Sequence, residues 1–153
     1  EMTSCGPNGG PLAGRGEYPA HIACNLFCKD EELYVGTLGA WMDGRFPKIT
    51  QDGKDGDEEP GYIANMQDGA TAGFKYFDCR GVRKVKIRVR GYCKGHFEVK
   101  TSWDGPALGT IPVDFTNVWT EYEADIAIPD GVHPLYFTYR GSGNASLLSF
   151  ALE

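Results

Sequence analysis

Three residues far apart in the chain carry side chains suited to holding a sugar ring. They are Tyr62 in the segment Gly61-Tyr62-Ile63-Ala64-Asn65, Trp119 in a polar stretch, and Asn144 in a Gly/Ser-rich turn. The apolar C–H face of a pyranose stacks on an aromatic ring, and an amide both donates to and accepts from hydroxyl groups. We therefore predict that Tyr62, Trp119 and Asn144 form a ligand-binding set drawn from three loops.

Each of these residues also has an ordinary structural interpretation. Tyr62 and Trp119 are alternatively core aromatics, although the polar neighbours of Trp119 favour an exposed position. Asn144 is alternatively a turn residue, and the run Asn-Ala-Ser that it begins matches a glycosylation acceptor by pattern alone.

Two charged segments are candidates for further binding sites. The acidic run Asp52–Glu59 offers oxygen ligands for calcium, but its spacing does not match an EF-hand loop, so a solvated acidic loop is the alternative. The row Lys84, Lys86, Arg88 and Arg90 lies on one face of a predicted strand. It is suited either to uronic-acid groups or to a ladder of ion pairs with acidic strands beside it.

No set of residues in the sequence has the pattern of a catalytic site. The three histidines, His21, His96 and His133, stand in separate contexts without a recognisable nucleophile. Glycoside hydrolysis needs two carboxylates at a defined separation, and no motif here marks such a pair among the 21 acidic residues. We predict a binding module and not an enzyme.

The amino-acid composition limits which binding partners and which fold class are expected. The net charge of −6 argues against nucleic acid, whose protein partners are normally basic, and no apolar run has the length of a membrane span. Five cysteines without metal-ligand spacing favour free thiols, with one disulfide as the alternative, and no cofactor is required. The 21 glycines and 9 prolines in 153 residues indicate many tight turns.

Alternating apolar residues predict the strands that must position these side chains. Inward rows are expected at three places along the second half of the chain: Val85, Ile87 and Val89; Ile111, Val113 and Phe115; Leu148, Phe150 and Leu152. Many short strands without an amphipathic helix predict an all-β fold, a β-sandwich of jelly-roll or immunoglobulin-like topology. Residues 1–20 have no apolar periodicity and are predicted to be a linker or the trailing edge of a neighbouring domain, with the module itself at 21–153.

From about His21 onward the chain resembles the family 6 carbohydrate-binding modules. The resemblance rests on four stretches of the chain: Pro60-Gly61-Tyr62-Ile63, Gly95–Ile111 with its Asp104-Gly105-Pro106 turn, Trp119 with Gly131–Thr138, and Asn144–Phe150. It implies a jelly-roll sandwich whose sugar site places Tyr62 and Trp119 on opposite faces of one sugar, with Asn144 nearby. It also implies a monomer attached to an upstream catalytic domain, as in the C-terminal part of a family 43 glycoside hydrolase.

The resemblance carries further expectations about ligand, location and metal. It implies an oligo- or polysaccharide ligand, xylan or arabinoxylan first and β-glucan second, and an extracellular or cell-surface site in a bacterium. The alternative is a structural accessory sandwich that packs on the catalytic domain and binds no glycan. Family members commonly hold a structural calcium, but Ala23-Cys24-Asn25 and Leu147-Leu148 lack carboxylates at the corresponding positions, so the metal site is an open question.

Overall fold

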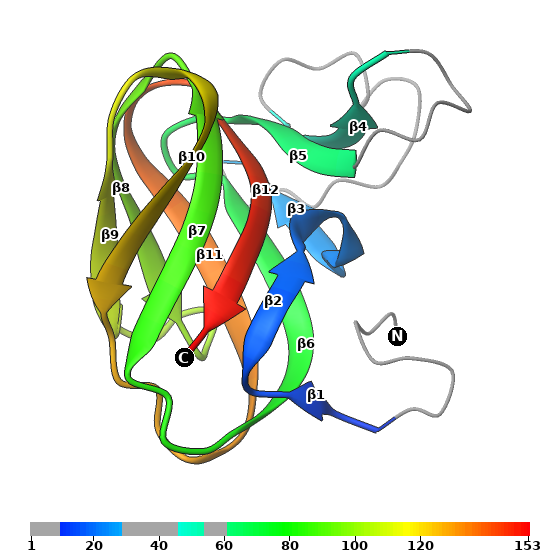
Figure 1. Cartoon of the computed structure of the whole chain (residues 1–153), viewed down its shortest axis with the longest axis vertical. Coiled ribbons are helices and arrows are strands. Elements are labelled where there is room, and N and C mark those ends of the chain that lie inside the picture. The colour runs from blue at the N-terminus through cyan, green and yellow to red at the C-terminus, as the bar shows by residue number, and fades with distance from the viewer. Residues whose placement is uncertain (1–9, 29–45, 54–60) are drawn as a thin grey trace.

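Two six-stranded β-sheets stack face to face and bury the core between them (Figure 1). The computed structural model describes residues 10–28, 46–53 and 61–153, and its one described helix is the short 3-10 turn η1, Ala20–Ile22. In the β6/β11 sheet the strand order is β1 (Leu12–Ala13), β6 (Thr71–Cys79), β11 (Gly131–Gly143), β8 (Cys93–Lys100) and β9 (Gly109–Val113), with β3 (Asn25–Phe27) also paired to β6. In the β7/β12 sheet the order is β10 (Thr116–Asp125), β7 (Lys84–Gly91), β12 (Ala145–Leu152), β5 (Gly61–Met66) and β4 (Lys48–Gln51), with β2 (Gly16–Pro19) also paired to β12. The predicted all-β sandwich is confirmed.

The alternation read from the sequence sets which side chains enter the core. Along β7, Val85, Ile87 and Val89 are buried, while Arg88 between them is exposed. Successive side chains of a strand point to opposite faces, so one face of each sheet is apolar and meets the other sheet.

A cluster of phenylalanines fills the centre of the sandwich. The Phe150 ring of β12 lies 4.7 Å from Phe74, 5.0 Å from Phe137 and 5.8 Å from Phe77, measured between ring centroids. Phe150 comes from the β7/β12 sheet and the other three from the β6/β11 sheet, so this cluster joins the two layers. Full burial of such rings is among the largest stabilising contributions available to a small domain.

Two of the predicted inward rows were wrong at one position each. Phe115 is 50% exposed, because β9 ends at Val113 and Phe115 lies in the connection to β10. In β12 the inward residue is Leu147, not Leu148, because the register with β7 shifts by one residue between Leu147 and Ser149. A β-bulge of this kind reverses the side-chain alternation from that point on.

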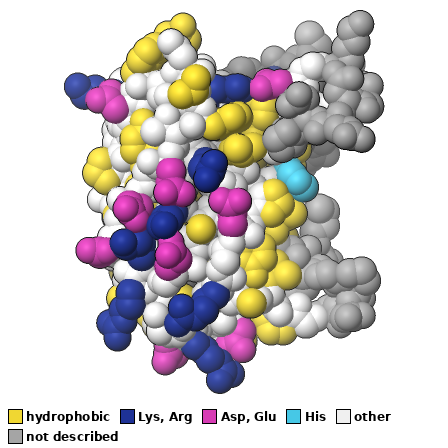
Figure 2. All heavy atoms as spheres, in the orientation of Figure 1, with side chains coloured by type: hydrophobic (Ala, Val, Ile, Leu, Met, Phe, Trp, Pro, Cys, Tyr) yellow, Lys and Arg dark blue, Asp and Glu magenta, His cyan; other side chains and the backbone are white. Residues whose placement is uncertain are grey.

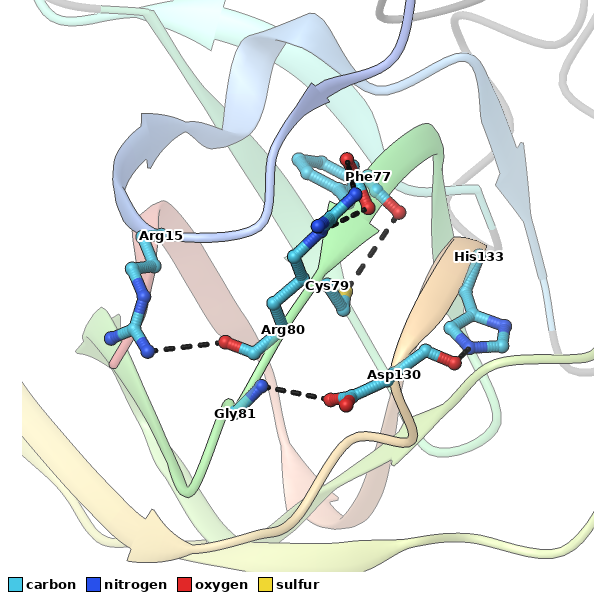
Figure 3. A network of polar contacts seen from close by, with 8 residues as sticks. Arg15, Phe77, Cys79, Arg80, Gly81, Asp130 and His133 are labelled. Carbon is cyan, nitrogen blue, oxygen red and sulfur yellow. Dashed lines mark hydrogen bonds and ion pairs between the residues drawn. The ribbon is translucent and has the colours of Figure 1, made fainter.

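Part of the segment predicted to be a linker contributes two strands to the sandwich. β1 pairs in parallel with β6, and β2 pairs with the C-terminal strand β12. Arg15, between β1 and β2, donates a hydrogen bond to the Arg80 carbonyl (3.1 Å), and Asp130 accepts one from the Gly81 amide (2.8 Å), as Figure 3 shows. The structure thus differs from the linker prediction over Leu12–Pro19, whose short, polar-flanked strands have too little apolar periodicity to be recognised. Residues 1–9 lie outside the described residues.

Cys28, Cys79 and Cys93 are buried free thiols. Among the described residues no helix has both the length and the hydropathy to cross a bilayer.

The phenylalanine cluster should dominate stability. Replacing Phe150 with Ala should lower the free energy of unfolding by about 3–5 kcal/mol, since the change removes a fully buried ring and leaves a cavity. Val132→Ala, at an exposed position of β11, is the matched control and should cost less than about 1 kcal/mol. Urea unfolding followed by fluorescence measures both; equal losses in the two variants would contradict the assignment of the core.

Candidate functional site

Tyr62 and Trp119 meet on the outer face of the β7/β12 sheet. Their ring centroids are 5.1 Å apart and the rings are inclined at 68°, an edge-to-face contact. Tyr62 is the second residue of β5, and Trp119 lies within β10, so both come from strands and not from loops as predicted. Of the predicted set, only Asn144 occupies a turn, the connection between β11 and β12.

Local irregularities aim these two side chains outward. Ile63 is fully buried, so its neighbour Tyr62 points to the opposite face of β5. In β10, Thr116 pairs with Gly91 and Thr120 pairs with Val89, which leaves three β10 residues opposite one residue of β7. The Thr116 and Thr120 hydroxyls both donate to the Val118 carbonyl (2.7 and 3.0 Å) and hold this irregular stretch, which carries Trp119.

An ion pair that sequence reasoning did not place here completes the cluster. The Arg90 guanidinium donates from Nη1 to Asp52 Oδ2 (3.1 Å) and from Nη2 to Asp52 Oδ1 (3.2 Å). The Tyr62 hydroxyl donates to the same Oδ1 (3.0 Å). The guanidinium carbon also lies 4.2 Å from the Trp119 ring centroid and 5.2 Å from that of Tyr62, both within cation–π range.

The cluster shifts the acid–base behaviour of its members in consistent directions. The hydrogen bonds from Arg90 lower the pKa of Asp52, and the bond to Asp52 raises the pKa of Arg90. Burial, followed by the hydrogen bond to Asp52, raises the pKa of the Tyr62 hydroxyl. At neutral pH the cluster therefore contains a charged carboxylate, a charged guanidinium and a neutral phenol.

The two rings do not form the open slot that the resemblance implied. A sugar held between two ring faces needs a separation of about 7–8 Å, because each carbon–carbon contact occupies about 3.5–4.0 Å. The observed edge-to-face contact at 5.1 Å leaves no such space, and Arg90 lies against Trp119. A ligand that enters between these rings must displace the guanidinium.

Asn144 lies near the end of this surface but is bound to a different neighbour. The Asn144 backbone N–H donates a hydrogen bond to the Tyr92 carbonyl (3.0 Å), and Asn144 is exposed to solvent. Tyr92 is 75% exposed and contacts the Phe115 ring at 4.9 Å. The described contacts thus join Tyr62 to Trp119, whereas Asn144 borders a second aromatic pair at the connections β7–β8 and β9–β10.

The remaining basic residues of β7 form a ladder of ion pairs. Lys84 lies 3.3 Å from Glu123, Lys86 lies 2.6 Å from Glu153, and Arg88 lies 3.7 Å from Glu17. Figure 2 shows the two signs of charge interspersed over this face. The interpretation of the row as a ladder is confirmed, so the face has no unbroken positive patch for an anionic ligand.

A shallow cavity that the sequence did not predict lies on the same face. Its volume is about 240 Å³, and it is lined by Glu17, Pro19, His21, Gly61, Arg88, Leu148 and Ser149. Leu148 reaches it because of the bulge in β12. Trp103 is half-buried, and its ring centroid lies 4.2 Å from that of Phe27.

No group of three or more His, Cys, Asp or Glu side chains suited to a metal ion occurs among the described residues. Most of the acidic run Asp52–Glu59 lies outside them, so calcium binding there stays a question for experiment.

Comparison with known proteins relates the chain to part of a longer enzyme. No protein-family model matches. The chain is 72% identical over 152 residues to a xylosidase/arabinosidase of Thermoclostridium stercorarium, covering 99% of the chain and 32% of that protein. It is 30% identical over 95 residues, 58% of the chain, to an arabinoxylan arabinofuranohydrolase of Bacillus subtilis, of which it covers 18%. The chain thus spans about a third or less of the curated relatives it matches.

Solved structures identify the fold. The module CsCBM6-3 of Clostridium stercorarium, in complex with cellobiose, has a TM-score of 0.71 at 19% identity, covering 95% of this chain and 98% of that one. A family 6 carbohydrate-binding module of Clostridium cellulolyticum, in complex with xylose, has a TM-score of 0.72 at 17% identity, covering 93% and 99%. A family 43 arabinoxylan arabinofuranohydrolase of Bacillus subtilis has a TM-score of 0.65 at 20% identity, and 28% of it is covered. The resemblance recognised in the sequence is confirmed: this is the fold of a family 6 carbohydrate-binding module and not that of a catalytic domain.

Removal of calcium should change the stability little. An ion that binds only the native state raises the melting temperature, so its removal lowers it. Because the expected first- and last-strand positions lack carboxylates, we expect melting curves with and without EDTA to agree within about 2 °C, less than the shift produced by 1 kcal/mol in a domain of this size. A fall of many degrees, reversed by added calcium, would reveal a site outside the described residues.

Proposed function

We propose that this chain, which has the fold of family 6 carbohydrate-binding modules, is a non-catalytic module that binds plant cell-wall polysaccharide at the Tyr62–Trp119 surface. The observation that carries the proposal is the meeting of Tyr62 and Trp119, the two aromatics singled out by type in the sequence, on one sheet face beside polar Asp52 and Arg90. Aromatic rings bordered by hydrogen-bonding groups suit a ligand with apolar faces and hydroxyl edges.

The proposed ligand is xylan or arabinoxylan, with β-glucan second. The similarity to a xylosidase/arabinosidase and to an arabinoxylan arabinofuranohydrolase supports a xylan backbone. Neighbours in fold are in complex with cellobiose and xylose, and another is a β-1,3-glucan binding module, which supports a neutral β-linked sugar more than one particular linkage.

The proposed mechanism is proximity. A module attached to a hydrolase holds the enzyme near its polymer and raises its effective concentration there. One shallow site of this kind corresponds to dissociation constants of roughly micromolar to millimolar. Because binding this weak is readily reversible, an enzyme acting outside a bacterial cell could dissociate from one part of the polymer and bind again at another.

A structural accessory role is the second candidate, and one observation favours it. Tyr92, Phe115 and Val118 are 75%, 50% and 68% exposed at one end of the sandwich. Exposed apolar groups that gather in one place suit a protein contact, here with the catalytic domain of the same enzyme. In that case the isolated module would be folded but would bind no glycan.

Trp119→Ala should abolish measurable binding while leaving the fold intact. Trp119 is half-buried on an outer face, so its loss removes a stacking surface and no core contact. Affinity gels with xylan, arabinan and mixed-linkage glucan, together with a melting curve, make the test. Tyr92→Ala, which removes an exposed ring outside the pair, is the control and should retain most of the binding. If Tyr92→Ala abolishes binding and Trp119→Ala does not, the site is misplaced; if no polymer retards the wild-type module, the accessory role is favoured.

Neutral oligosaccharides should bind better than acidic ones of equal length. Asp52 lies within the cluster, the Arg90 charge is paired to it, and the chain carries a net charge of −6, so a uronic acid meets repulsion. Calorimetric titration of matched neutral and glucuronic-acid-bearing xylo-oligosaccharides measures the difference. Tighter binding of the acidic ligand, weakening with salt, would contradict this expectation and would indicate that the ligand displaces a glutamate from Lys84, Lys86 or Arg88 of β7.

A further inference from the structure

The Arg90 side chain lies where the proposed ligand would stack. Its guanidinium carbon is 4.2 Å from the Trp119 ring centroid, the separation of a direct face contact, and 5.2 Å from that of Tyr62. A guanidinium is planar and stacks on aromatic faces as a sugar ring does. The two therefore compete for the same aromatic surface.

Asp52 holds Arg90 in this position from a different part of the chain. Both guanidinium nitrogens of the fork donate to the two Asp52 oxygens, at 3.1 and 3.2 Å, and Tyr62 adds a third hydrogen bond to Oδ1 at 3.0 Å. Asp52 directly follows β4, whereas Arg90 is near the end of β7. The bonds thus fasten Asp52, at the end of β4, across the aromatic pair.

The pair is weak enough for a sugar to open. The Arg90 and Asp52 side chains are 27% and 48% exposed, so water competes for both charges. Exposed ion pairs and cation–π contacts each contribute little, and together they correspond to about a tenfold preference for the closed arrangement. An equilibrium of that size lowers the apparent affinity of a ligand without preventing its binding.

We propose that Asp52 and Arg90 form a latch that covers the Tyr62–Trp119 surface and must open before a neutral sugar can stack there. The latch rests on the proposed function, because it regulates access to that same site. In this proposal Arg90 opposes sugar binding because its guanidinium covers the Trp119 ring. The charge and hydrogen-bond donors of Arg90 would otherwise suit a direct contact with a sugar.

Titration of neutral xylohexaose into wild-type and variant modules tests the latch. Arg90→Ala removes the group that covers Trp119, and affinity should rise about tenfold. Asp52→Asn keeps the shape but removes the ion pair, and affinity should rise by a smaller factor. Arg140→Ala is the matched control. Arg140 lies on β11 of the other sheet and forms an ion pair with Glu98 (3.0 Å), so its loss should leave the affinity for xylohexaose unchanged. Melting curves establish that each variant is folded, and Asp52→Asn serves alone if Arg90→Ala does not fold.

The salt dependence of the affinity provides a second test, because a purely structural role of the ion pair would not change it. Raising the salt from about 0.01 M to about 1 M shortens the screening length from about 30 Å to about 3 Å and weakens the ion pair. Wild-type affinity for the uncharged ligand should increase with salt, and Arg90→Ala should show no such increase.

The outcomes separate the latch from the proposed function. If the wild type binds and Trp119→Ala does not, but Arg90→Ala and Asp52→Asn bind no more tightly than wild type, the latch is wrong. Weaker binding by Arg90→Ala in that case would make Arg90 a direct ligand contact. If neither the wild type nor either latch variant binds any neutral oligosaccharide, the proposed function itself is wrong and the latch with it.

Discussion

The packing of Phe150 against three phenylalanines of the facing sheet is the contact on which the rest of the structure depends. It joins β12, the last strand in the chain, to β6 and β11 of the other sheet. Once Phe150 points inward, the side-chain alternation of β12 and of its partners β7 and β5 is fixed up to the next bulge. The polar face of this sheet is therefore a consequence of its apolar face.

The candidate site follows from the same constraint. Val89 and Ile63 are fully buried, so Arg90 and Tyr62 must project from the outer face of the sheet. The irregular pairing of β10 with β7 then turns Trp119 toward them. Exposed guanidinium and aromatic groups placed together in this way contact one another, and Asp52 satisfies the fork of Arg90. The cluster is therefore a consequence of strand register. Displacement of the Arg90 side chain alone would open the Tyr62–Trp119 surface to a sugar.

Much of the fold could be predicted from the sequence because alternation is a local signal. The inward row of β7 is confirmed, and residue type together with the family resemblance predicts that Tyr62 and Trp119 lie together. The errors fall where register departs from strict alternation: Leu148 at the β12 bulge, Phe115 beyond the end of β9, and Trp119 in a strand instead of a loop. A bulge depends on the partner strand, which one segment of sequence does not specify. The bond between Asp52 and Arg90 was missed for the same reason, since the two residues are distant in the chain and each belonged to a different charged run.

The central claim is that a neutral β-linked sugar binds at the Tyr62–Trp119 surface of this module. Titration of xylohexaose into the isotope-labelled module, followed by NMR, tests it most directly, because each affected amide and indole is located in the sequence. The account predicts that the largest shifts occur at the Trp119 indole N–H and at the backbone amides of Tyr62 and Arg90, with little change at the Trp103 indole. Shifts centred instead on Tyr92 and Phe115, or on the His21 cavity, with an unchanged Trp119 signal, would contradict it.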